Sequence, residues 1–281
     1  MNTSMFSTNE VIETFATKTA KTKKDLPFGR QLLLGIMAGA FIAIGYLAFV
    51  RVSGVLPKAW GSFGTFLGAC LFPMGLLAIT FVGGELVTGN MMVLTFGFLE
   101  KQVKFYELIK NWILVLLANC IGGALVAFFF GHVVGLTQGA FAAKTIAVAS
   151  AKLADTPTMM IVSGVGCNML VGMSIFFGAM SKDFIGKLIG VWFPIMIFVV
   201  CGFQHVVANA FILTAGALAG GGFTVAAMVQ NILFVFIGNM IGGSLCLAVP
   251  VYYANRKPNP ALHPGHANPK AQVVTMKEQA K

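Results

Sequence analysis

The chain has 281 residues, of which 57% are hydrophobic and 10% are charged, and its mean hydropathy is +0.85. Soluble globular domains carry about 25% charged residues, so this composition excludes a soluble enzyme and indicates an integral membrane protein. The net charge of +10 needs an explanation within that class before it is taken as a sign of nucleic-acid binding.

The N-terminal segment, residues 1–30, is polar and contains four lysines. It lacks the basic start, apolar middle and small-residue cleavage site of a secretory signal peptide in their expected order, so no cleaved signal is predicted. Apolar residues within 2–20 recur at near-helical spacing, which predicts a short amphipathic helix on the membrane surface.

Six apolar stretches are long enough to cross a bilayer core of about 30 Å, which takes roughly 20 helical residues. They cover residues 31–50, 60–99, 108–131, 158–178, 185–219 and 229–251. The second and the fifth are too long for one crossing, and each is interrupted by a polar sequence with glycine: GGELVTGN at 83–90 and GFQHVVAN at 202–209. Both are therefore predicted to be broken helices. A tail with several prolines, residues 253–281, follows the transporter domain of residues 31–252 and is predicted to be disordered.

The distribution of positive charge predicts the orientation. With six spans, 15 of the 19 Lys and Arg residues lie on the side of the two termini, and Arg51, Lys58, Lys144 and Lys152 lie on the other. Because translocated loops avoid positive charge, both termini are predicted to be cytoplasmic, in the cell (plasma or inner) membrane. This explains the basic composition without nucleic acid. The five cysteines lie in apolar stretches without metal-ligand spacing, so neither a metal nor a cofactor is predicted.

The two halves, about 31–131 and 158–251, share spaced motifs. Asn119-Cys-Ile-Gly-Gly recurs as Asn239-Met-Ile-Gly-Gly at an offset of 120, and the two interrupted segments align at an offset of 119. That second alignment pairs Gly83 with Gly202, Glu85 with Gln204 and Asn90 with Asn209. Three spans per half is an odd number, so the predicted fold is all-α with six transmembrane helices in an inverted 3+3 repeat. Its broken second and fifth helices meet near mid-membrane, where freed backbone groups are tolerated beside a wet cavity.

These features resemble the formate/nitrite transporter family of anion channels. The resemblance covers about residues 30–252 and rests on GGELVTGN, GFQHVVAN, the Lys152-x15-Asn168 spacing and the closing GNMIGG. It implies an aquaporin-like protomer with its own pore, assembled as a homopentamer. It also implies the passage of a small monovalent anion, with formate leading and nitrite, hydrosulfide or lactate as alternatives.

The resemblance implies roles for individual residues. The family's central histidine falls on His205, its companion asparagines on Asn168 and Asn239, its vestibule lysine on Lys152, and the threonine of its mobile loop on Thr88. Two hydrophobic slits correspond to Phe72, Leu76 and Phe198 on the outer side and to Leu86, Val87 and Val171 on the inner side. The supporting polar residues are Glu85, Asn90, Asn209 and Gln204. Glu85 is predicted to serve as a cap or a hydrogen-bond partner where the helix restarts. Many members carry Glu where this chain has Gln204, so a charge beside His205 is missing.

A lysine followed by a buried histidine suits the passage of a weak acid. An anion that enters an apolar slit loses several kcal/mol of hydration. Neutralising a carboxylic acid of pKa near 4 at pH 7 costs only about 4 kcal/mol, at roughly 1.36 kcal/mol per pH unit. Lys152 would concentrate the anion, and His205 would donate a hydrogen bond or a proton. The sequence therefore predicts a bidirectional path for formate-like anions, with or without an accompanying proton.

Two other classes of function stay open at this point. A haem-anchoring membrane subunit needs axial ligands from facing helices, and His205 is the only histidine well inside a predicted span. A neutral-solute channel of the aquaporin kind is compatible with an inverted repeat, although a buried histidine and a vestibule lysine suit an anion better.

Overall fold

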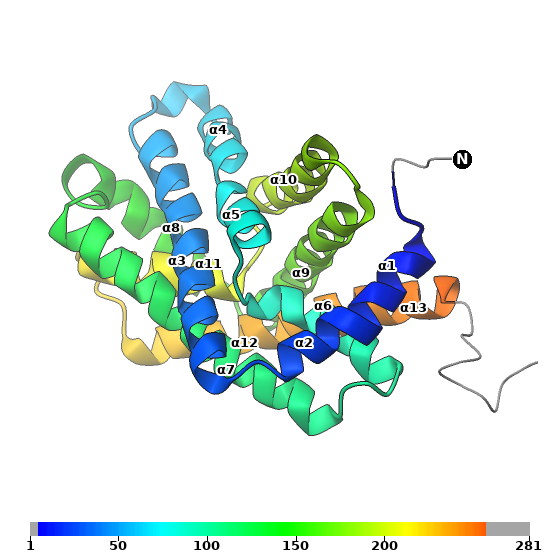
Figure 1. Ribbon diagram of the computed structural model, residues 1–281. Helices are drawn as coiled ribbons and strands as arrows, with labels where there is room; N and C mark the ends of the chain where they lie inside the picture. Colours follow the sequence, from blue (N-terminus) through cyan, green and yellow to red (C-terminus); the bar gives the residue numbers. More distant parts are fainter. Residues whose placement is uncertain (1–4, 257–281) are drawn as a thin grey trace, which may run out of the picture.

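The computed structural model describes residues 5–256 of the chain. The predicted tail lies outside the described residues from residue 257 onward. The described chain is helical throughout, and its one extended pairing is an isolated bridge between Met5 and Ser181. Figure 1 shows the helices gathered into one body, as the predicted all-α class requires.

The helices follow one another in chain order. They are α1 (Thr8–Thr14), α2 (Ala20–Lys24), α3 (Phe28–Ser53), α4 (Phe63–Leu71), α5 (Met74–Val82), α6 (Val87–Leu99), α7 (Phe105–Val126), α8 (Ala142–Ala154), α9 (Pro157–Met180), α10 (Phe184–Val200), α11 (Val206–Leu218), α12 (Val225–Met240) and α13 (Val249–Asn255). Short π-helical turns at Phe15–Thr19, Ala127–Val133 and Ile241–Ala248 continue α1, α7 and α12.

Five helical stretches of the described residues are long and apolar enough to cross a membrane. They are Phe28–Ser53, Phe63–Val82, Phe105–Val133, Pro157–Met180 and Val225–Asn255, and α6, α10 and α11 are shorter apolar helices. One side of α7 exposes Ile113, Leu117, Ile121 and Leu125, at the four-residue spacing of a helix face. Such a continuous apolar face fits lipid or a neighbouring subunit, not water. The count of six crossings and the inverted relation of the halves stay predictions.

Both long stretches are broken at the predicted motifs. α5 ends at Val82, Gly83 adopts a φ of +105°, and α6 begins at Val87. In the second half α10 ends at Val200, Gly202 adopts a φ of +71°, and α11 begins at Val206. Positive φ is costly for residues with a Cβ, so glycine is the residue that allows each chain to leave its helix. The extended link after α5 is visible in Figure 1.

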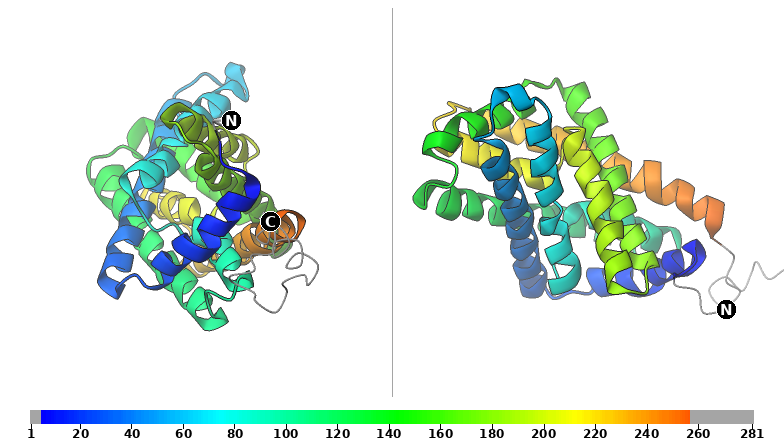
Figure 2. Two further views of the ribbon diagram at one scale, coloured as in Figure 1. Left: turned by 45° about the vertical axis from the view of Figure 1, so that its right-hand side comes forward. Right: turned by 90° about the horizontal axis from the view of Figure 1, so that it is seen from above.

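Close helix contacts support each break. Gly122 of α7 lies against the Ile36 carbonyl of α3, and Gly242 lies against the Val165 carbonyl of α9, so that a Cβ at either glycine would collide with backbone. These glycines belong to the two repeated Asn-x-Ile-Gly-Gly motifs. The motifs therefore bring α7 against α3 and the end of α12 against α9. Figure 2 shows α3, α4–α5 and α9–α10 side by side, and α10 contacts both α4 and α5.

The N-terminal helix packs on the protein. Ser7 and Glu10 form a reciprocal capping box at the start of α1, and the apolar side chains of Val11, Ile12 and Phe15 are buried. Ala20 of α2 lies against Gly97 of α6. The helix predicted here is therefore present, and its apolar residues pack against α6 and neighbouring helices. Its position on the membrane surface stays a prediction.

Candidate functional site

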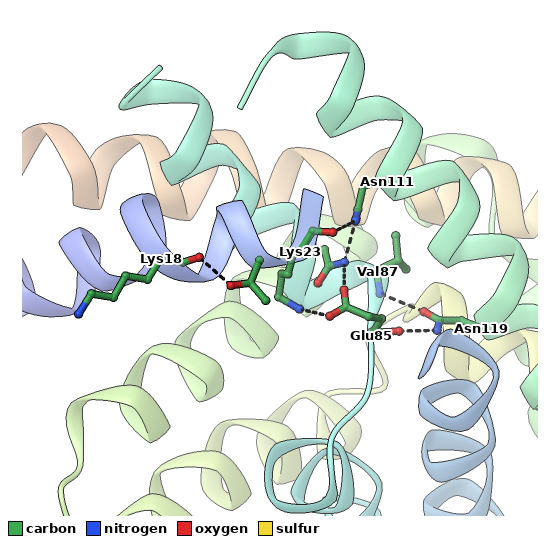
Figure 3. Close-up of polar contacts among 8 residues, drawn as sticks. Lys18, Lys23, Glu85, Val87, Asn111 and Asn119 are labelled. Carbon is green, nitrogen blue, oxygen red and sulfur yellow. Dashed lines mark hydrogen bonds and ion pairs between the residues drawn. The ribbon is translucent and has the colours of Figure 1, made fainter. Parts of the chain in front are cut away.

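The side chain of Asn119 satisfies the backbone at the first break. Its Nδ2 donates to the Glu85 and Gly35 carbonyls, each at 2.8 Å, and its Oδ1 accepts from the Val87 N–H at 3.0 Å. Figure 3 shows Asn119 reaching from α7 to the extended segment. A buried break needs such partners, because an unpaired backbone group costs about 1–3 kcal/mol.

Side chains from α2, α6 and α7 bond to Glu85. Its carboxylate accepts from Asn90 Nδ2 at 2.7 Å and from Lys23 Nζ, which belongs to α2, at 2.8 Å. Asn90 Nδ2 also donates to Asn111 Oδ1 at 2.8 Å. Figure 3 shows Lys23 pointing to Glu85 beside this network. The carboxylate is therefore neutralised within the structure, and it ties the N-terminal helix to the break.

The second break repeats the same contacts with equivalent residues. Asn239 Nδ2 donates to the Gly164 and Gln204 carbonyls at 2.8 and 3.0 Å, and Asn239 Oδ1 accepts from the Val206 N–H at 2.9 Å. Asn209 Nδ2 donates to Gln204 Oε1 at 2.6 Å and to Asn231 Oδ1 at 2.8 Å. In the alignment of the two halves, these partners are equivalent to the partners of Asn119 and Asn90. The two halves therefore share hydrogen bonds as well as sequence motifs.

His205 caps the start of α11 through its Nδ1, and its Nε2 faces α6 in the first half of the chain. Its Nδ1 accepts from the Ala208 N–H at 3.1 Å, so the neutral ring carries its proton on Nε2. Nε2 lies 3.1 Å from the Thr88 Oγ1, at the start of α6. The ring is 2% exposed and stacks on Phe198, with 5.7 Å between the ring centroids. A hydrogen-bond donor therefore sits where the two broken helices meet.

An apolar constriction surrounds this donor. It is lined by Ile42, Phe72, Leu76, Leu86, Val171, Ile195, Phe198 and His205, and it leaves no space for a water molecule. Five of the six residues predicted for the two slits are among these. Val87 is not, because its side chain packs in the core and its N–H serves the first break. These residues form one closed constriction.

A cavity of about 470 Å³ opens on one side of the constriction. His205, Phe72 and Phe198 belong to both, and Lys144, Lys152 and Asp155 line the cavity further out. Lys152 Nζ donates to the Gly202 and Phe203 carbonyls of the second break, at 2.7 and 2.9 Å. Lys152 lies on α8, outside the candidate spans, and burial lowers its pKa to about 8, while Cys167 and Asp155 oppose that shift.

A second cavity, of about 250 Å³, adjoins the other side of the constriction through Leu76 and Leu86. Its polar lining comes from Thr19, Lys23, Thr80, Asn90 and Lys187. A cavity lined by at least one lysine thus adjoins each side of the constriction. Among residues 5–256 no group of three or more His, Cys, Asp or Glu side chains is arranged to hold a metal ion.

Comparison with known proteins identifies the family. The sequence profile of the formate/nitrite transporter family matches residues 9–253. The chain belongs to the formate/nitrite transporter family. It is 44% identical to an uncharacterised transporter of Bacillus subtilis, over 86% of this chain and 91% of that one. It is 42% identical to a formate channel of Bacillus thuringiensis, over 83% of this chain and 88% of that one.

The family fold is shared as well. A solved ion channel of the formate/nitrite transporter family superposes with a TM-score of 0.80 at 23% identity, and the match covers 88% of this chain and 98% of that one. The chain is therefore a membrane protein of a transporter family, and the curated relatives named here are a transporter and a channel.

Within this transporter family member, the companion asparagines contact backbone. Asn168 Nδ2 donates to the Thr88 and Asn239 carbonyls, at 3.2 and 2.7 Å, and Asn239 holds the second break. Neither lines the constriction. Thr88 belongs to the first turn of α6, and the extended residues before it form the break. The structure thus brings Thr88 into contact with His205, whereas both asparagines bond to backbone and lie outside the lining of the constriction.

Sequence reasoning missed two lining residues. Ile195 corresponds to Leu76 at the offset of 119 that aligns the breaks. Ile42 corresponds to Val171 at an offset of 129, the same offset that relates Gly35 to Gly164. Carrying the repeat alignment outward from the breaks could have found both, because equivalent positions of a repeat approach the same axis.

Proposed function

We propose that the protein passes formate, together with a proton, through a path in each protomer. The observation that carries this proposal is the dry constriction around His205, with a lysine-containing cavity on either side. The 42% identity to a formate channel supports formate as the substrate. The proposal also includes cytoplasmic termini, a location in the plasma or inner membrane, and a homopentamer, as the family resemblance implies.

His205 acts in this proposal as a hydrogen-bond donor. Its Nδ1 lone pair accepts from the Ala208 N–H, so a second proton there would require that bond to break. The donor is Nε2–H, which bonds to Thr88 Oγ1 and can turn to an oxygen of the substrate's carboxyl group instead. The histidine thus orients the substrate and favours its passage without cycling through a doubly protonated form.

The proton enters with the substrate. Lys152 holds formate by charge in the cavity of about 470 Å³, which is called the outer cavity because Lys152 is predicted to lie on the side opposite the termini. The constriction beyond it has no space for the water that would hydrate an anion. Crossing as an anion costs several kcal/mol, whereas neutralising formate at pH 7 costs about 4 kcal/mol. The acid form is therefore the species that passes His205, and flux should follow a proton gradient.

Proteoliposomes with a panel of anions test this function. We expect formate influx to exceed that of nitrite, hydrosulfide and lactate, and to rise when the outside is more acidic than the inside. His205→Phe keeps a ring to stack on Phe198 but removes the donor, so formate flux should fall about tenfold or more. His132→Phe, which changes an exposed histidine, serves as the matched control.

Three results would contradict the proposal. Equal formate flux in the His205→Phe and wild-type proteins would remove the histidine from the mechanism. Flux that ignores the pH gradient would favour passage of the bare anion. Glycerol-driven swelling of the vesicles without formate uptake would favour the neutral-solute channel.

A further inference from the structure

The cavity of about 250 Å³, called the inner cavity because Lys23 of the N-terminal segment lines it, contains two lysines. The charge of one is balanced by a carboxylate, and the charge of the other is not. Lys23 of α2 and Lys187 of α10 both line it, together with polar side chains and the Leu76 and Leu86 side chains that border the constriction. An anion that approaches the constriction from this side must pass through this space. The net charge that it meets depends on which lysine is already paired.

The charge of Lys23 is compensated. Its Nζ lies 2.8 Å from Glu85 Oε1, and the two side chains are 16% and 7% exposed. The Asn90 and Asn119 contacts hold the Glu85 residue in place. The two opposite charges of this pair are close together and held in place. Their electric fields therefore largely cancel at the distance of a bound anion.

The charge of Lys187 has no such compensation. Within residues 5–256 no carboxylate lies within ion-pairing distance of its ammonium group. The nearest acidic residue along its own helix, Asp183, is occupied in capping α10, where it accepts from the Gly186 N–H at 2.7 Å. The Lys187 side chain is half-buried, and its stem lies beside Gly178 of α9 at the cavity wall.

We propose that Lys187 captures the substrate anion in the inner cavity. This inference rests on the proposed passage of formate and on the proposed cytoplasmic side of the N-terminal segment, whose Lys23 lines that cavity. An uncompensated cation in a cavity with low-dielectric walls raises the local concentration of a small monovalent carboxylate. Lys152 does this on the outer face, so Lys187 makes capture possible from both sides and supports flux in either direction.

Membrane vesicles of defined orientation test the assignment. In inverted vesicles, whose cytoplasmic face is outside, Lys187→Gln should raise the KM for formate about threefold to tenfold with a small change in maximal rate. In right-side-out vesicles the KM should be unchanged. Lys187→Arg should restore the inverted-vesicle KM, and the effect of Lys187→Gln should shrink at high ionic strength because salt screens the charge.

Lys110→Gln provides the matched control, because it removes one exposed lysine from the first turns of α7 and lines none of the cavities described above. An unchanged KM for Lys187→Gln in inverted vesicles would overturn the inference. So would an equal loss of maximal rate on both faces that Lys187→Arg does not restore. Absence of formate flux in the wild-type protein would instead overturn the proposed function, and this inference with it.

Discussion

At the scale of single residues, Gln204 has a structural reason to be neutral. Its Nε2 donates to Asp155 Oδ2 at 2.7 Å and to the Lys152 carbonyl at 3.1 Å, and its Oε1 accepts from Asn209. A glutamate at this position would place two carboxylates side by side and lose both donated bonds. The amide therefore lets the second break keep an acidic neighbour, Asp155, whereas Glu85 at the first break faces Lys23.

In the proposed mechanism, Lys152 gives transport a pH dependence that can be separated from protonation of the substrate. Burial lowers the pKa of Lys152 to about 8, so the cationic form that is proposed to attract the anion is lost as the outer pH rises through about 8. Arginine stays charged over this range. The ratio of wild-type to Lys152→Arg formate flux should therefore fall several-fold between pH 7 and pH 9. A constant ratio in a stopped-flow uptake assay would show that the Lys152 charge does not control capture.

At the scale of helical elements, each break depends on an asparagine from another helix. Asn239→Ala would leave the Val206 N–H and the Gln204 carbonyl buried without their partner, at about 1–3 kcal/mol each. We expect a loss of about 2–4 kcal/mol in the free energy of unfolding, together with reduced formate flux because His205 directly precedes Val206.

Denaturant titration in detergent measures this loss. Asn255→Ala is the matched control, since Asn255 is exposed and, among residues 5–256, its side chain bonds only to the Val251 carbonyl one turn earlier. Its removal should therefore change stability by less than about 0.5 kcal/mol. Equal stabilities of the two variants would mean that water or a shifted backbone satisfies the second break as well as Asn239 does.

At the scale of the whole molecule, the repeat explains what the sequence could predict. Polar residues within apolar stretches identified both breaks and His205, since such residues are costly in a membrane unless they have a use. The family resemblance then supplied Thr88 and five of the constriction residues. Contacts between helices that are far apart in the sequence could not be predicted from the sequence alone. Apolar spacing predicted a helix in residues 2–20, but spacing alone does not say whether lipid or α6 covers its apolar face.

A buried ion pair joins three distant parts of the chain. Arg256, at the end of α13, bonds to Glu100 at the end of α6, and it lies 3.8 Å from Glu13 of α1. Tyr252 also donates to Glu100, at 3.2 Å. The Arg256 and Glu100 side chains are 5% and 1% exposed, so the pair is shielded from solvent. The contact holds together the N-terminal helix, the end of α6 within the first half, and the end of the second half.

The losses of stability from removing the two partners of this pair should therefore not add. Arg256→Gln removes the guanidinium group from the buried Glu100 carboxylate, and breaking a buried pair in this way costs about 3–5 kcal/mol. Glu100→Gln should cost a similar amount, and the double variant should be more stable than the sum of the two losses requires. Thermal unfolding in detergent gives the three values, and limited proteolysis at the lysines of α2 reports whether the N-terminal helix has detached. Strictly additive losses would mean that Arg256 and Glu100 act independently, and the N-terminal helix would then owe its position to its other contacts, such as the Lys23–Glu85 ion pair and the apolar packing against α6.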